Sequence, residues 1–103
     1  MIIGTKNTQD TIGTDSLPVS EAKLNEYSER IRLILSNVST GGQVLSIAVA
    51  AEAVASKGIV LYPGGSVSWE KQGNIPIQQE RVNAISSAAN GLLAVYEEVI
   101  NRG

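Results

Sequence analysis

The chain has 103 residues and a formal net charge of −2, with eight basic and ten acidic side chains, one tryptophan, three tyrosines and no phenylalanine. It contains neither cysteine nor histidine, which excludes disulfides, thiolate zinc sites and histidine-based acid–base catalysis. The basic residues are scattered, and no apolar run approaches the roughly 18 residues that cross a bilayer, so we expect neither nucleic acid nor a membrane as a partner.

Residues 1–18 are dominated by Thr, Asn, Asp, Gln and Gly and show neither a helical nor a strand period. This composition buries too little apolar surface to offset the entropy of ordering, which is typical of a disordered tail or of an arm held by a partner. We expect an extended N-terminal arm. Its predicted partner-binding residues are its scattered apolar side chains: Ile2, Ile3, Ile12 and Leu17.

A helix is predicted within residues 19–39, with Ser20 as its N-cap. Its apolar residues recur at intervals of three and four, the spacing of a two-heptad seam, which places Arg30 on the outer face beside Glu26. The seam either packs on the adjacent domain or joins copies of the chain, and its isoleucines then favour a trimer. The predicted oligomerisation residues are Leu24, Tyr27, Ile31, Ile34 and Val38.

Residues 40–103 are predicted to form a compact β-rich domain. Residues 44–55 are rich in alanine and fit either a helix or a strand, but β-branched residues favour a strand in the first half. Residues 59–62 are typical of a buried strand. Residues 66–70 alternate strictly, which predicts a strand.

The turn between these two strands has a specific signal. Pro63 and Gly64 occupy the central positions that a type II turn requires. In the strand that follows, alternation places Val67 and Trp69 on the same side, which we expect to face the core.

The last part of the chain, residues 81–100, permits two interpretations. Its apolar residues fit a helical stripe, but residues 81–86 and 92–99 also fit the two strands of a hairpin. Asn90-Gly91 is a strong hairpin-turn signal, so we favour the hairpin. The predicted fold class is mainly β: a small antiparallel β-sandwich or barrel-like domain, preceded by the extended arm and one α-helix. The alternative is an α+β domain with a C-terminal helix.

The ten carboxylates are the only plausible acid–base material, and their spacing does not suggest a catalytic pair. Glu97 and Glu98 are adjacent, so a strand would point them to opposite faces, and we expect both to be solvated. The single Ser-x-x-Lys match, Ser20 to Lys23, is explained by helix capping. We therefore predict a protein that is not an enzyme, with no catalytic, cofactor-binding or metal site.

From Gln43 onward the order of features resembles the small β-sandwich modules of bacteriophage virion proteins, such as head decoration, cement and head-fibre base proteins. The resemblance is carried by residues 56–62, 63–69, 82–86 and 93–97. It implies a structural protein that attaches to or cements capsid or tail subunits through its arm and helix. It also implies that the protein lies in the virion, and in the host cytoplasm during assembly, as a homo-oligomer.

A second class of function fits the same sequence. The chain would then be a small soluble bacterial adaptor or regulatory binding module, with the arm and helix packed against their own domain.

Overall fold

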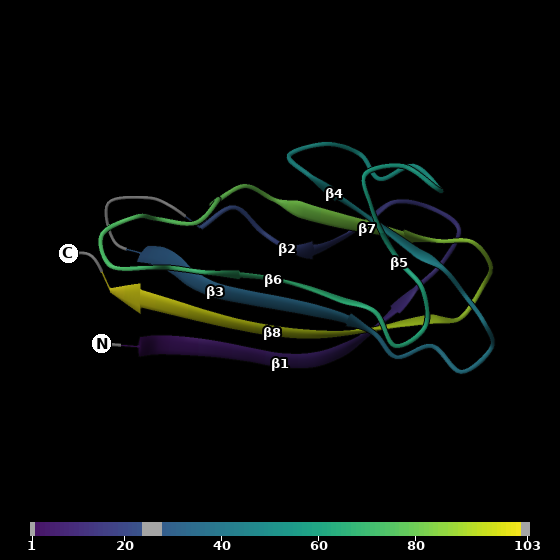
Figure 1. Cartoon of the computed structure of the whole chain (residues 1–103), viewed down its shortest axis with the longest axis horizontal. Helices are drawn as coiled ribbons and strands as arrows, with labels where there is room; N and C mark the ends of the chain where they lie inside the picture. The colour runs from purple at the N-terminus through teal and green to yellow at the C-terminus, as the bar shows by residue number, and fades with distance from the viewer. Residues whose placement is uncertain (1, 24–27, 102–103) are drawn as a thin grey trace.

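The computed structural model describes residues 2–23 and 28–101, and within them the chain forms eight strands and no helix. Figure 1 shows the strands as two stacked layers along the long axis of the molecule. The strands are β1 (Ile2–Ile12), β2 (Leu17–Ser20), β3 (Ser28–Asn37), β4 (Leu45–Val49), β5 (Ile59–Leu61), β6 (Ser66–Glu70), β7 (Val82–Ser86) and β8 (Gly91–Asn101).

The strands form two four-stranded antiparallel sheets, ordered β1-β8-β3-β6 and β2-β7-β4-β5. Strand β1 pairs with β8, β2 with β7, β3 with β6, and β4 with β5. The chain is therefore one long ribbon of paired strands, folded over so that each described connection except β4–β5 crosses between the sheets. This is the strand order of an eight-stranded jelly roll. The prediction of a mainly β domain with two antiparallel sheets is confirmed.

The apolar core lies between the two sheets. In β3, Leu33 and Leu35 point inward, and β8 contributes Leu93 and Val95 from its own alternating pattern. Burying each such side chain stabilises the fold by roughly 1.5–3 kcal/mol. The remaining buried members of this core are Ile12, Val19, Leu45, Ile47, Leu61, Val82 and Ala84.

The prediction of a helix within residues 19–39 is wrong. The described part of this segment contains β2 and β3, and the burial in β3 falls on residues two apart rather than on a helical stripe. A run such as residues 31–35 satisfies both periods, and pairing with two neighbouring strands decides in favour of β structure.

The helical seam predicted for oligomerisation does not form, because its described residues are not in a helix. Ile31 lies at an irregularity in the β3–β8 register, Ile34 points to the outer side of the sheet, and Val38 follows the end of the strand. Leu24 and Tyr27 lie outside the described residues. The reason for favouring a trimer is lost with the helical seam.

The prediction of an extended N-terminal arm is also wrong. Residues 2–12 form β1, whose register along β8 runs from Ile2 opposite Ile100 to Ile12 opposite Gly91. Ile12 is fully buried in the chain's own core, whereas Leu17 in β2 is 40% exposed. The side chains of Ile2 and Ile3 are not among those described. Most of β1 is polar because it is an edge strand with largely exposed side chains, and this composition resembles that of an arm.

Strands were predicted correctly where local patterns are strong. β4, β5 and β6 lie where alternation and β-branched residues placed them. Val67 and Trp69 pack against the core as expected. The type II turn is confirmed, because the Gly65 amide donates to the Tyr62 carbonyl at 2.7 Å and Gly64 has a φ of 87°.

The C-terminal region is β structure rather than a helix, but its two strands do not form the predicted hairpin. β7 belongs to one sheet and β8 to the other, so residues 87–90 cross between the layers. Asn90 adopts a φ of 65°, which explains why the Asn-Gly signal is present without a hairpin. β1, β3 and β8 come from the three predicted segments 1–18, 19–39 and 40–103, and they are neighbours in one sheet.

Candidate functional site

The broadest candidate surface is the outer face of the β1-β8-β3-β6 sheet. We define this outer face by the outward side chains of three cross-strand rows, which the strand registers fix. The first row is Thr5, Glu98, Arg32 and Glu70; the second is Asn7, Tyr96, Ile34 and Ser68; the third is Gln9, Ala94, Ser36 and Ser66.

The first row is a network of charges. Arg32 lies between two carboxylates, with its Nε 3.5 Å from Glu70 Oε1 and its Nη1 3.3 Å from Glu98 Oε2. The Tyr96 hydroxyl donates to the same Glu98 oxygen at 2.5 Å. That hydrogen bond, followed by burial, raises the pKa of Tyr96 above its ordinary value, because it is lost when the phenol ionises. The hydrogen bond to Glu98 of the first row therefore holds the Tyr96 ring beside Ile34.

Next to this network the outer face is hollowed into a shallow groove of about 410 Å³. Apolar groups from Ile34 and Ala94 contribute to its lining, and amide and hydroxyl side chains surround them. A tyrosine and an arginine beside a small apolar area is the composition of protein–protein contact surfaces. The groove is lined by Asn7, Thr8, Gln9, Ile34, Ser36, Ala94, Val95 and Tyr96.

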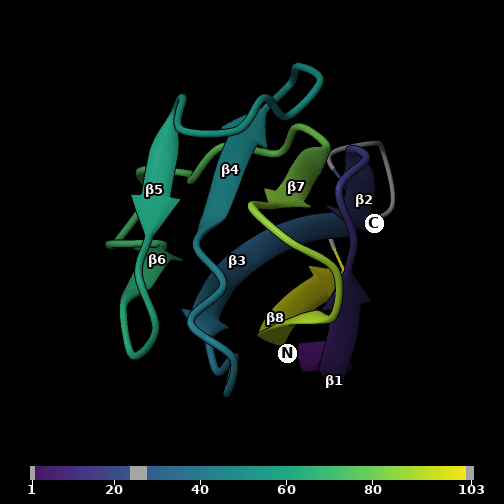
Figure 2. The same cartoon turned by 90° about the vertical axis from the view of Figure 1, so that its right-hand side faces the viewer.

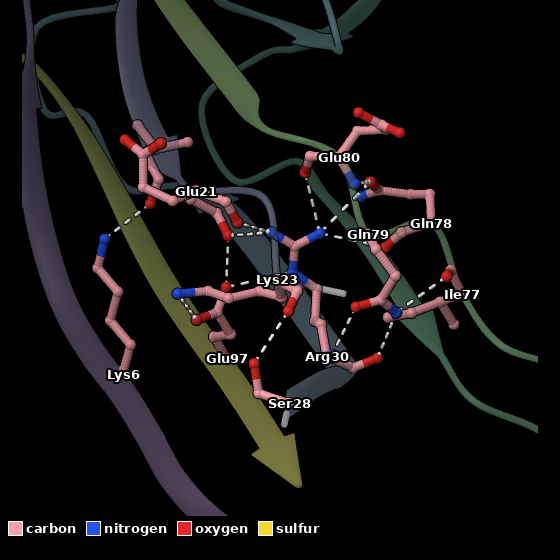
Figure 3. Close-up of polar contacts among 12 residues, drawn as sticks. Lys6, Glu21, Lys23, Ser28, Arg30, Ile77, Gln78, Gln79, Glu80 and Glu97 are labelled. Carbon is pink, nitrogen blue, oxygen red and sulfur yellow. Dashed lines mark hydrogen bonds and ion pairs between the residues drawn. The ribbon is translucent and has the colours of Figure 1, made fainter. Parts of the chain in front are cut away.

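A second feature is the buried Arg30 cluster, in which Arg30 of one sheet contacts Glu97 of the same sheet and Ser20 of the other (Figure 3). Arg30 has no exposed surface, and its Nε lies 3.2 Å from Glu97 Oε2. Its Nη2 donates to the Ser20 hydroxyl at 2.5 Å and to the Glu21 carbonyl at 2.6 Å. Ser20 in turn donates to Glu97. The guanidinium thus connects β3 to β8 and to the end of β2.

The same guanidinium also holds the connection between β6 and β7. Its Nη1 donates to the carbonyls of Gln78 and Glu80, both at 3.1 Å. The Gln79 side chain accepts from the Arg30 amide at 2.7 Å and donates to the Arg30 carbonyl at 2.7 Å. One side chain therefore satisfies both backbone groups of a residue next to the β3 irregularity, as a neighbouring strand would do.

Burial and charge act in opposite directions on this cluster. Burial lowers the pKa of the Arg30 guanidinium from its ordinary value, while the hydrogen bond and charge of Glu97 raise it. Lys23 approaches the other carboxylate oxygen, with its Nζ 3.4 Å from Glu97 Oε1. The ion pair between Arg30 and Glu97 is therefore a structural brace. The donors of the Arg30 guanidinium are directed at carbonyls and a carboxylate of the chain itself.

Sequence reasoning missed this cluster. It placed Arg30 on a solvated helix face and treated Glu97 and Glu98 as solvated, but Glu97 is 3% and Glu98 7% exposed. The expectation that the two glutamates face opposite ways is confirmed by their partners, Arg30 inside and Arg32 outside. A regular alternation would turn Arg30 outward with Arg32, and the register irregularity between them has no local sequence signal.

A third feature is an open cleft of about 640 Å³ beside β2 and β7. Residues 50–58 fold over this side, because the Asn83 side chain donates to the Ala51 carbonyl at 2.6 Å and the Ala53 amide donates to the Ser16 hydroxyl at 2.9 Å. The cleft carries charges of both signs from Glu52, Glu80 and Arg81. Most of its residues come from exposed connections, and only Pro18 of β2 and Asn83 of β7 lie in strands.

Residues 2–23 and 28–101 contain no group of three or more His, Cys, Asp or Glu side chains arranged to hold a metal ion. The same residues contain no helix that is long and apolar enough to cross a membrane.

No family model matches the sequence, and no curated protein matches it at a significant level. The outer face, the Arg30 cluster and the jelly-roll strand order are therefore the observations on which a function can be argued.

Proposed function

We propose that this chain is a non-catalytic structural protein of a virus particle, which attaches to or cements neighbouring capsid or tail subunits. The observation that supports this most is the strand order β1-β8-β3-β6 over β2-β7-β4-β5, because the eight-stranded jelly roll recurs in viral capsid proteins. The same architecture also occurs in lectins and cupins, so the surface of the molecule, and not its fold alone, distinguishes these functions.

The outer face supports a contact with protein. It is one side of a four-stranded sheet in a molecule that measures 42 × 22 × 19 Å. A surface bounded by the two longer dimensions offers on the order of 800 Å² per partner, the size of a standard protein interface. Tyr96 and Arg32 are held in place by Glu98, so little side-chain entropy would be lost on binding. We propose the outer face as the attachment surface, in place of an arm and helix.

Incorporation into particles tests this proposal. Particles from cells that express the tagged chain are purified by density gradient, and we expect the chain to co-sediment with them. Ile34→Arg places a charge in the groove of the outer face and should abolish co-sedimentation without changing the thermal unfolding midpoint.

Val54→Arg is the matched control, because Val54 is an exposed apolar residue in the connection between β4 and β5, far from the outer face in sequence and sheet. This variant should co-sediment normally. Wild-type chain that stays in the slowly sedimenting fraction, or Ile34→Arg chain that co-sediments as wild type does, would contradict the proposal.

The second candidate is the soluble bacterial adaptor or regulatory binding module. One observation favours it: β1 and β2 complete the two sheets of the chain itself, so residues 2–20 need no partner to become ordered. The adaptor predicts that the tagged chain stays in the slowly sedimenting cytosolic fraction while particles are assembling. The same gradient therefore separates the two candidates.

A further inference from the structure

The long free edge of β1 is the feature that the proposed attachment surface leaves unexplained. The two sheets have four edge strands: β1 and β6 in one, β2 and β5 in the other. Figure 2 shows β1 and β2 on the same side of the sandwich, with β5 and β6 on the opposite side. An edge strand presents unpaired backbone N–H and C=O groups, which proteins protect by shortness, proline or charge.

β1 differs from the other three edges. It has 11 residues, against 5 in β6, 4 in β2 and 3 in β5. β2 also carries Pro18, which cannot donate a ladder hydrogen bond. β1 contains no proline, and its register along β8 is regular from Gly4 to Ile12. It is therefore the one edge with both the length and the regularity to take another strand.

The sequence of β1 is symmetric in its chemistry about Thr8. Counting outward from Thr8, the residues one step away are both amides, those two steps away have opposite charges, and those three steps away are both threonines. The three pairs are Asn7 with Gln9, Lys6 with Asp10, and Thr5 with Thr11.

We propose that β1 pairs antiparallel with β1 of a second copy about a twofold axis through Thr8, which joins the two β1-β8-β3-β6 sheets into one of eight strands. In this register Lys6 lies opposite Asp10 of the second copy, and Asp10 lies opposite Lys6 of the second copy. A twofold axis perpendicular to the sheet keeps opposite side chains on the same side, so each chemical pair meets directly.

The charges select this register over its neighbours. Alternation and the twofold axis restrict slips to even numbers of residues. A slip of two moves the axis to Asn7 or Gln9 and leaves Lys6 and Asp10 opposite uncharged residues, and a slip of four moves it to Lys6 or Asp10 and places like charges opposite each other. Both side chains are available, since Lys6 is 36% and Asp10 22% exposed, and their own Nζ–Oδ2 separation is 3.8 Å. Lys6 also donates to the Val19 carbonyl at 2.7 Å, which holds its ammonium group on the inner side of the sheet.

A charge exchange tests the pairing. Lys6→Asp alone gives a chain with two carboxylates at positions 6 and 10, and Asp10→Lys alone gives one with two ammonium groups. Each should repel its own copy and raise the dimer dissociation constant by about tenfold or more, as measured by sedimentation velocity. An equimolar mixture of the two variants should form a heterodimer as tight as the wild-type homodimer.

The control is Lys57→Asp, which reverses an exposed charge in the connection between β4 and β5 and should leave the dissociation constant unchanged. Circular dichroism verifies that each variant is folded. A wild-type chain that is monomeric at micromolar concentration, or a mixture of the two variants that does not associate, overturns the pairing.

A cross-link tests the position of the axis without altering any charge. The wild-type chain has no cysteine, so Thr8→Cys introduces a single thiol, and the axis places it opposite the same thiol of the second copy. Mild oxidation should convert this variant to a covalent dimer. Thr5→Cys lies on the same strand but opposite Thr11 of the second copy, so it should stay largely uncross-linked.

Equal cross-linking of the two variants overturns the proposed register. The pairing does not depend on the virion role. Its tests are made on the purified chain and are independent of incorporation into particles.

Discussion

At the scale of single residues, Arg30 and Arg32 show how one chemical type serves two purposes on one strand. Arg30 has no exposed surface, while the side chain of Arg32 is 42% exposed on the outer face. Both contact glutamates of β8, at 3.2 Å and 3.3 Å. The charges of Arg30 and Glu97 are removed from water, so each is stabilised mainly by the other, whereas solvent screens the attraction between Arg32 and Glu98.

The first prediction follows from this contrast. Arg30→Met should lower the free energy of unfolding by about 3–5 kcal/mol, because it leaves the Glu97 carboxylate buried and the carbonyls of Glu21 and Glu80 without their donor. Arg32→Met should lower it by less than about 1 kcal/mol. Urea denaturation of the two variants provides the measurement, and equal losses would show that Arg30 is not a brace.

At the scale of elements, the connection between β4 and β5 depends on one glycine. Gly58 has a φ of 78°, and a methyl group on it would lie 2.5 Å from the carbonyl oxygen of Ile47. Gly64 in the turn before β6 has a similar φ of 87°, but a methyl group there would meet nothing within 4 Å. The two positions therefore separate backbone strain from steric contact.

We expect Gly64→Ala to lower the free energy of unfolding by about 1–2 kcal/mol, the cost of a left-handed conformation for alanine. Gly58→Ala should cost about 1–3 kcal/mol more, because β5 must also move away from β4. Chemical denaturation measures both variants. A Gly58→Ala variant no less stable than Gly64→Ala would be inconsistent with this packing.

The same scale shows how far sequence patterns reach. β5, the type II turn and β6 were predictable because Ile59–Leu61, Pro63-Gly64 and the alternation around Trp69 are all local signals. β3 was not, because its apolar spacing satisfies a helix and a strand equally. The partners of each strand were not predictable either, since β1 finds β8 some ninety residues away and no local signal encodes that register.

The candidate site was less predictable than the fold. Ile34 was singled out, but for a helical seam rather than for the groove in which it lies. Tyr96 and Arg32 come together only through the β3–β8 register, and Arg30 turns inward only through the irregularity in that register. Pairing between distant strands creates all of these contacts.

At the scale of the whole molecule, the first and last strands depend on each other. β1 covers one side of β8 along its length and contributes Ile12 to the core. Contacts between the two ends of a chain form late and slowly in folding, because a long loop must close first. A mainly β domain of this size also has little stability to spare.

Deleting residues 2–12 should therefore abolish the cooperative unfolding transition instead of leaving a folded domain that has lost its arm. Thermal unfolding followed by circular dichroism measures this. Thr5→Ala keeps the β1 backbone and should unfold cooperatively near the wild-type midpoint. A truncated chain that still unfolds cooperatively would contradict this prediction and show that β1 is an arm on which the fold does not depend.

The register that places Ile2 opposite Ile100 also allows the strands to be connected in a different order without changing how they pair. The start of β1 and the end of β8 lie side by side at one end of the molecule, in the position of two strands that lack only a turn between them (Figure 1). A short linker there, with new termini opened between β4 and β5, would give a circular permutant that begins at β5 and ends at β4. It would retain every strand pair of the jelly roll.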